Sequence, residues 1–360
     1  MDRRLPQLDI LRAVAIFFVL GRHLLFIPPH APSLFWSVVL FWKQCGWIGV
    51  DLFFVLSGFL ISGLLFSAYI HHGEIKAGRF LARRALKLYP AFYAFLLISL
   101  SARLNPPSPR QILGEILFLQ NYLDSAWNHT WSLAVEEHFY LLLVALFLFL
   151  AKSKTGFRRL PFIILTVCAG LTLLRTALAF GYHFPWTRIL IKTHFRIDSL
   201  FFGVLLSWLT HFKKEALLAW LDPRRFWVGA ACLSLILPVM MMDLKLQPFS
   251  YSLGLTCLYV GFGGLMLMWV SASRPWEKSP PVFASLLSKI GRHSYSIYLW
   301  HMPVYALAVT LVRNWLKIPS FGLELAVYVF GSIGVGAALS LLIEIPVLKL
   351  RDRLIPSRVL

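Results

Sequence analysis

Apolar stretches about as long as a bilayer is thick recur along the chain and alternate with short polar or basic segments. About 20 consecutive apolar residues can cross a membrane as an α-helix, because a helix satisfies its backbone hydrogen bonds internally. The pattern therefore predicts an all-α fold, a polytopic membrane helix bundle of about ten transmembrane helices. We expect these helices near residues 8–27, 46–68, 88–103, 131–151, 160–181, 188–211, 226–243, 250–272, 290–312 and 322–346.

Composition agrees with this pattern. Of the 360 residues, 58% are hydrophobic and 14% are charged, which is too apolar for a soluble protein of this size. The four cysteines show no paired spacing and mostly lie in apolar stretches, so we expect neither a disulfide nor a metal site. We interpret residues 1–360 as a single membrane domain, with a helical bundle over about 1–350 and a basic tail over 351–360.

The net charge of +19 is unevenly distributed along the chain. Lysine and arginine concentrate in alternate connecting segments, as the positive-inside rule describes for cytoplasmic loops. This distribution predicts that both termini are cytoplasmic and that the basic segments contact membrane lipids. It explains the charge without a nucleic-acid partner.

The first predicted helix contains two ionisable residues, Arg12 and His23. Such side chains are costly at membrane depth, so a functional role is the first hypothesis. Eleven residues at about 100° each bring both side chains to one face, roughly 16 Å apart along the axis at about 1.5 Å per residue. The alternatives are that Arg12 reaches the lipid headgroups and that His23 packs near the interface.

Further polar residues lie at a similar depth in the predicted topology. Asp51 begins the second helix, Glu136 lies in the outer half of the fourth, and Arg196 and Asp198 lie in the sixth. A histidine beside a carboxylate can take a proton from an alcohol that attacks a carbonyl carbon. The alternative is a charge-neutralising network that only joins helices.

Tyr140 and His301 are two further candidate residues. Glu136 is preferred over Glu137 because it shares a helix face with Tyr140, one turn later. His301 lies in the middle of the ninth predicted helix, and Pro303 can kink that helix towards a cavity. We interpret His301 as a packing or cavity-lining residue rather than as a catalyst.

A basic segment precedes the third predicted helix and contains Arg83, Arg84 and Lys87. Arg83 and Lys87 are four residues apart and share a face, and arginine forks bind phosphate groups well. The segment could therefore bind a phosphorylated cofactor. Ordinary positive-inside charge or contact with anionic lipids explains it equally well.

Five motifs in this order resemble those of the acyltransferase 3 family of integral-membrane O-acyltransferases, namely LDILRAVAIFFVLGRH, GWIGVDLFFVLSGFLIS, FLARRALKLYP, TWSLAVEEHFY and IGRHSYSIYLWHMPV. The family's Arg-x10-His pair matches Arg12 and His23, and its Trp-Ser-Leu-x-x-Glu-x-x-Phe-Tyr motif selects Glu136. Its basic motif usually reads Arg-Arg-x-x-Arg, whereas this chain has Lys87 at the last position. Lysine keeps the charge but loses the bidentate fork.

The resemblance implies transfer of an acyl group, commonly acetyl, from cytoplasmic acetyl-CoA or another acyl-CoA. The acceptor would be a hydroxyl of a glycan, or of a lipid-linked or small molecule, at the outer side of a bacterial inner membrane. Many relatives carry an additional extracytoplasmic domain. We expect this chain to acylate its acceptor directly or through a separate extracytoplasmic partner.

In the resulting hypothesis, Arg83, Arg84, Lys87 and Arg12 bind the CoA phosphates. His23, supported by Glu136 or Asp51, is either the general base or a covalent acyl carrier. The substrate-binding candidates are Arg196, Asp198, His301 and Tyr140.

Other interpretations compete with this one. A transporter or flippase of a small metabolite or lipid-linked sugar could use the same polar cavity, although the chain lacks an evident internal repeat. An inactive relative acting as a membrane sensor is a third possibility. Ser57 could be a nucleophile, but a Ser-Gly pair in a helix is more often a close-packing element.

Overall fold

The computed structural model describes residues 5–24, 33–101, 106–182, 185–272, 281–318 and 320–356. These residues form helices joined by turns and contain no strand, which confirms the predicted all-α fold. Within them, seven helical segments are long and apolar enough to cross a membrane: Leu34–His72, Trp131–Lys152, Gly156–Gly181, Lys214–Met241, Leu253–Ser271, Ser294–Trp315 and Phe321–Leu354. The total of ten and the cytoplasmic termini stay predictions.

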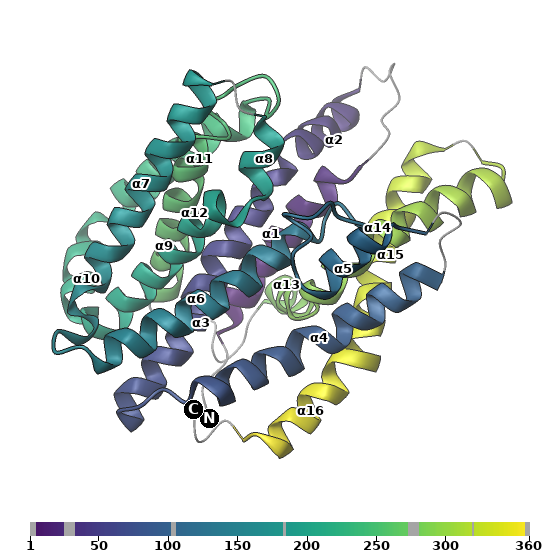
Figure 1. Cartoon of the computed structure of the whole chain (residues 1–360). Coiled ribbons are helices and arrows are strands. Elements are labelled where there is room, and N and C mark those ends of the chain that lie inside the picture. The colour runs from purple at the N-terminus through teal and green to yellow at the C-terminus, as the bar shows by residue number, and fades with distance from the viewer. Residues whose placement is uncertain are drawn as a thin grey trace. The chain divides into compact units, whose positions relative to one another are not determined.

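The chain divides into two compact units, and Figure 1 shows their helices in order along the chain. The first unit comprises the described residues within 5–49, 82–106 and 281–356. Its helices are α1 (Pro6–Arg22), α2 (Leu34–Cys45), α4 (Ala77–Ser101), α13 (Val282–Arg292), α14 (Ser294–Val309), α15 (Phe321–Leu339) and α16 (Ile345–Leu354). Of α4, only the part from residue 82 onwards belongs to this unit. A 3-10 turn spans Gly46–Ile48, and π-helical segments span Thr310–Trp315 and Ser340–Glu344.

Helix α1 is central to the first unit and packs against α2, α13 and α14, while α14 also packs along α15. The helix backbones approach closely where a glycine lies at the contact. A Cβ atom on Gly291 of α13 would lie 1.7 Å from the carbonyl oxygen of Asp9 on α1. The hydroxyl of Tyr328 on α15 donates a hydrogen bond of 3.0 Å to the carbonyl oxygen of Leu20, near the end of α1.

The second unit comprises the described residues within 50–81 and 107–272. Its helices are α3 (Gly49–His72), α5 (Pro109–Ile116), α6 (Trp131–Lys152), α7 (Leu160–Gly181), α8 (Trp186–Ile191), α9 (Thr193–Phe212), α10 (Lys214–Leu221), α11 (Arg225–Met241) and α12 (Leu253–Ser271). Short 3-10 turns span Gly156–Arg159 and Asp222–Arg224. Helix α9 packs against α6, α7, α8, α10 and α12.

Helices α3 and α9 cross with their backbones in contact. A Cβ atom on Gly58 would lie 1.9 Å from the carbonyl oxygen of Leu200, and one on Gly203 would lie 2.3 Å from that of Val55. Membrane helices approach closely at small residues, because packing rather than the hydrophobic effect drives their association. Gly58 therefore has the close-packing role that the sequence suggests for the Ser57-Gly58 pair.

Several helix ends differ from the expected ones. Helix α4 begins at Ala77, so the basic segment lies within it, and Pro90 is an interior position. A proline costs one backbone hydrogen bond, which the surrounding helix tolerates here. Helix α1 ends at Arg22 with His23 as its C-cap, and residues 25–27 of the expected helix lie outside the described residues. The predicted helix over 290–312 is divided at His293.

The crossing of α3 and α9 predicts that Gly58→Ala destabilises the protein by roughly 1–3 kcal/mol, because the added methyl meets backbone that cannot move aside. The matched control is Gly170→Ala on α7, where nothing lies within 4 Å of the added atom. That change should be neutral or stabilise by about 0.5–1 kcal/mol. Thermal unfolding of the detergent-solubilised protein measures both, and equal melting temperatures for the two variants would contradict the close crossing.

Candidate active site

The charge of Arg12 is partly compensated within its own helix. Its Nη1 atom lies 3.1 Å from Oδ1 of Asp9, which is one turn earlier and almost fully buried. The Nε atom of Arg292, at the end of α13, lies 3.7 Å from Oδ2 of the same carboxylate. A quarter of the Arg12 side chain is exposed. Asp9 therefore orients one guanidinium that sequence reasoning selected and a second that it did not.

The opposite end of α1 carries a pair of histidines. The Nδ1 atom of His23 lies 3.0 Å from the carbonyl oxygen of Val19 and 3.1 Å from Nε2 of His301 on α14. The two ring centroids are 4.8 Å apart. His301 is fully buried, and its Nδ1 atom lies 2.6 Å from the carbonyl oxygen of Tyr298. The structure thus brings together two predicted site residues that are 278 positions apart.

The basic segment of α4 lies half-buried in the first unit. Arg83 forms an ion pair of 2.9 Å with Asp352 on α16 and donates a hydrogen bond to the carbonyl oxygen of Ile355. Arg84 and Lys87 lie on the same helix, within one turn of Arg83. Arg83 therefore has a clear structural role in anchoring the C-terminal helix.

In the second unit, three hydroxyl and carboxyl groups meet between α3 and α6. The hydroxyl of Tyr140 donates a hydrogen bond to Oε2 of Glu136, one turn earlier. The hydroxyl of Ser57 lies 3.3 Å from the same oxygen and 2.9 Å from the Tyr140 hydroxyl. The shared face expected for Glu136 and Tyr140 is confirmed. Ser57, which sequence reasoning set aside, is the third member of this cluster.

Asp51 pairs with Arg196 rather than with a histidine in the second unit. Their side chains are 1% and 2% exposed, and Arg196 Nη2 lies 2.8 Å from Asp51 Oδ1. The guanidinium also lies over the rings of Phe54 and Trp131, at 5.5 and 5.7 Å from their centroids. Such a pair holds α3, α6 and α9 together.

A second buried pair joins α7 to α9. Arg175 Nη2 lies 2.7 Å from Asp198 Oδ2, and neither side chain is more than 2% exposed. Arg175 also donates to the carbonyl oxygen of Phe195 and to the hydroxyls of Thr172 and Thr256, at 2.6, 3.4 and 3.1 Å. The contacts of Asp198 are those of a helix-joining network.

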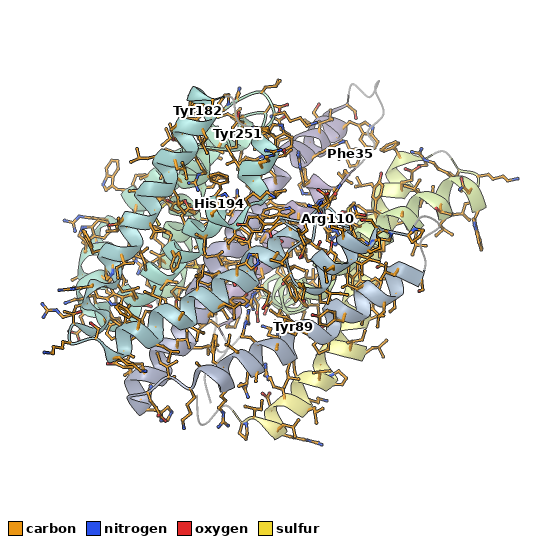
Figure 2. The ribbon with its side chains drawn as sticks, viewed as in Figure 1. Phe35, Tyr89, Arg110, Tyr182, His194 and Tyr251 are labelled. Atoms are coloured by element: carbon orange, nitrogen blue, oxygen red, sulfur yellow. The ribbon has the colours of Figure 1, made fainter. Side chains whose placement is uncertain are left out.

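His194 lies apart from these pairs, on the exposed side of α9. Figure 2 labels it, and its Nδ1 atom lies 2.9 Å from the hydroxyl of Tyr122, with the two rings stacked. The ammonium of Lys192 lies 4.9 Å from the centre of the Tyr122 ring. Nearby, the Nδ1 atom of His138 lies 2.7 Å from the hydroxyl of Thr193.

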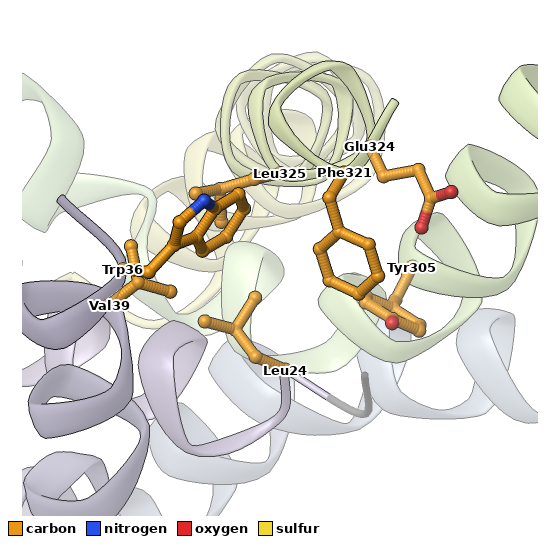
Figure 3. A pocket seen from close by; sticks show the side chains of 7 residues that line it. All are labelled: Leu24, Trp36, Val39, Tyr305, Phe321, Glu324 and Leu325. Carbon is orange, nitrogen blue, oxygen red and sulfur yellow. The ribbon is translucent and has the colours of Figure 1, made fainter. Parts of the chain in front are cut away.

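A small, mostly apolar pocket lies in the first unit, and Figure 3 shows its lining. Leu24 directly follows His23, and Tyr305 lies one turn after His301, so the pocket is adjacent in sequence to the histidine pair. Glu324 is the carboxylate at its edge and pairs with Arg313 at 2.5 Å. The remaining lining residues are Trp36, Val39, Phe321 and Leu325.

The family model for the acyltransferase domain matches residues 5–344, which is almost the entire chain. The chain belongs to the acyltransferase 3 family. With seven helices among its described residues long and apolar enough to cross a membrane, this acyltransferase is an integral membrane protein. Among the described residues, no group of three or more histidine, cysteine or acidic side chains is placed to hold a metal ion.

Two curated relatives indicate the kind of reaction within the acyltransferase 3 family. The peptidoglycan O-acetyltransferase OatA of Listeria monocytogenes is 27% identical over 334 residues, which cover 86% of this chain and 50% of that protein. The O-acetyltransferase OatA of Staphylococcus aureus is 27% identical over 333 residues, covering 84% and 51%. The chain thus spans about half the length of these relatives. No solved structure matches it.

The buried pair of Asp51 and Arg196 predicts a large loss of stability when one partner is removed. Arg196→Met leaves an uncompensated carboxylate in an apolar environment and should cost about 3–5 kcal/mol, while the double variant Asp51→Leu/Arg196→Met should recover most of it. Asp222→Asn is the control, because it breaks an exposed pair with Arg225 and should cost less than about 1 kcal/mol. Thermal unfolding in detergent ranks the variants; a mild effect of Arg196→Met would count against this assignment.

Proposed function

We propose that this acyltransferase is an O-acetyltransferase that uses cytoplasmic acetyl-CoA, or another acyl-CoA, to acylate a hydroxyl of a cell-envelope glycan at the outer side of a bacterial inner membrane. The observation that carries the proposal is the imidazole of His23 at the end of α1, eleven residues after Arg12, in a chain of this family. The names of the relatives favour peptidoglycan or a similar glycan as acceptor.

His23 is the proposed catalytic residue. As a general base, it takes the proton of the acceptor hydroxyl while the oxygen attacks the thioester carbonyl. The new C–O bond forms, the C–S bond breaks, and CoA leaves as a thiolate that takes up a proton. As a covalent carrier, His23 would itself attack the thioester and pass the acyl group to the hydroxyl in a second step. Both routes need an unprotonated ring nitrogen.

The proposed CoA-binding residues all belong to the first unit: Arg12, Arg83, Arg84 and Lys87. Arg84 is the strongest candidate, because a guanidinium offers phosphate a bidentate contact that an ammonium does not. Arg83 shares its donors with Asp352 and Ile355, which favours a supporting role. Arg12 is oriented by Asp9.

Two further proposed catalytic residues belong to the second unit. Glu136 is proposed as the catalytic carboxylate, since hydroxyls of Ser57 and Tyr140 contact its Oε2 atom. Asp51 is a weaker proposal, because Arg196 fixes its charge. The proposed substrate-binding residues are Tyr140, Arg196 and Asp198 of the second unit and His301 of the first. We propose that these residues belong to one membrane domain with cytoplasmic termini.

A transporter or flippase is the alternative function. It would account for buried polar residues in apolar helices, but the family match favours acyl transfer. Thioester hydrolysis or acyl exchange by the purified protein separates the two functions, because transport breaks no thioester bond.

Acyl transfer from radiolabelled acetyl-CoA in inside-out membrane vesicles tests the proposal. His23→Ala should lower glycan labelling at least about 100-fold, since a positioned acid or base contributes about 10²–10⁴-fold. His72→Ala is the control, as His72 is exposed at the end of α3 and should leave labelling unchanged. Equal labelling in wild type, His23→Ala and empty vesicles, with other acyl-CoAs also tested, would reject the function.

The same assay tests the CoA site through its KM. Arg84→Ala should raise the KM for acetyl-CoA roughly tenfold or more with a smaller effect on kcat, because a charge-assisted hydrogen bond contributes about 1.5–3 kcal/mol. Arg159→Ala removes an exposed arginine next to α7 and should change neither constant. An unchanged KM in Arg84→Ala would exclude Arg84 from donor binding.

A further inference from the structure

The hydrogen bonds of His301 determine where its proton lies. Its Nδ1 atom is 2.6 Å from the carbonyl oxygen of Tyr298, and a carbonyl oxygen can only accept. The Nδ1 atom must therefore carry a hydrogen and donate it. A neutral imidazole has one donor and one acceptor nitrogen, so Nε2 of His301 is an acceptor. Full burial favours this neutral form.

The contacts of His23 determine its tautomer in turn. Its Nδ1 atom faces two acceptors, Nε2 of His301 at 3.1 Å and the carbonyl oxygen of Val19 at 3.0 Å. A hydrogen on Nδ1 of His23 satisfies both contacts as a bifurcated bond. Without that hydrogen, the lone pair of Nδ1 would point at the lone pairs of the Val19 oxygen.

A charged His301 would reverse the bond between the rings but does not fit these contacts. Its Nε2–H would donate to Nδ1 of His23, which would then face the oxygen of Val19 as one acceptor facing another. It would also place a cation in a fully buried position, which costs several kcal/mol. The neutral arrangement satisfies these three contacts, from His301 to Tyr298, from His23 to Val19 and between the two rings.

We propose that His301 is a positioning residue that holds His23 in its Nδ1–H tautomer, so that Nε2 of His23 is the reactive nitrogen. The inference rests on the proposed function and names the atom of His23 that takes the proton or carries the acyl group. When Nε2 of His23 takes a proton, the bond from its Nδ1–H to His301 becomes charge-assisted and stronger. A neutral imidazole here has the role that a carboxylate has in a serine hydrolase triad.

The surrounding helices keep the two rings in place. The ring of Tyr298 packs against His301 at a centroid distance of 5.7 Å. The hydroxyl of Tyr328 donates a hydrogen bond to the carbonyl oxygen of Leu20. This bond fixes the end of α1, where His23 is the C-cap. Helices α1, α14 and α15 together set the geometry on which the tautomer depends.

Nitrogen-15 NMR of the histidine-labelled full-length protein in bilayers tests the tautomer directly. Among the eleven histidines, the signals of the pair are identified by their loss in His23→Asn and His301→Gln. We expect His23 of the wild type to be protonated at Nδ1. Protonation at Nε2 alone would overturn the inference. The NMR readout does not depend on activity. Failure of the proposed function would be recognised separately, because the wild-type protein would then transfer no acyl group.

Kinetics of two His301 variants give a second test. The amide oxygen of His301→Gln can accept from Nδ1–H of His23, whereas His301→Leu cannot. We expect His301→Leu to lower kcat roughly 100-fold or more with an unchanged KM for acetyl-CoA, since loss of a tautomer-holding residue costs up to about 10⁴-fold. His301→Gln should recover at least tenfold of this loss. Equal kcat values for the two variants would contradict the role, and the wild-type NMR spectrum decides if neither variant folds.

Discussion

The cost of placing ionisable groups among apolar helices governs this structure. A charge without a partner in such surroundings costs several kcal/mol, so buried charges are paired or hydrogen-bonded. The chain meets this requirement in two ways. Arg175 with Asp198 and Arg196 with Asp51 are almost fully buried ion pairs, which fix the charge of both partners. Other groups have neutral hydrogen-bonding partners among their contacts.

The kind of partner distinguishes residues that join helices from candidate catalytic residues. An ion pair resists a change of protonation, because losing either charge strands the other. A histidine bonded to a neutral histidine, or a carboxylate bonded by hydroxyls, can gain or lose a proton at lower cost. The contacts of His23 include a histidine, and those of Glu136 include the hydroxyls of Ser57 and Tyr140. The family motifs select the same two residues.

The sequence was informative wherever the relevant residues share one helix. The period of 3.6 residues brings Glu136 and Tyr140 to one face, and Asp9 and Arg12 could have been paired by the same rule. Contacts between helices are different, because they depend on which faces pack together. Neither the bond from His23 to His301 nor the ion pair of Arg83 with Asp352 follows from spacing.

A helix boundary was predictable from the sequence only where the apolar stretch and the helix end at the same residue. The basic segment was expected to precede a helix that begins near residue 88, yet α4 starts at Ala77 and contains both the basic residues and Pro90. Arginine and lysine are good helix formers, so a basic segment can continue a helix beyond its apolar part. The proline removes a single bond from a long helix.

The histidine pair also constrains the two routes proposed for acyl transfer. A general base must reach the acceptor proton and a covalent carrier must reach the thioester carbon, and each needs a lone pair on the imidazole. The carbonyl of Val19 and the ring of His301 both face Nδ1 of His23, so the lone pair lies on Nε2 in either route. Acceptor and donor must therefore approach the same edge of one ring. The base route needs both substrates at that edge together, whereas the carrier route lets them come in turn.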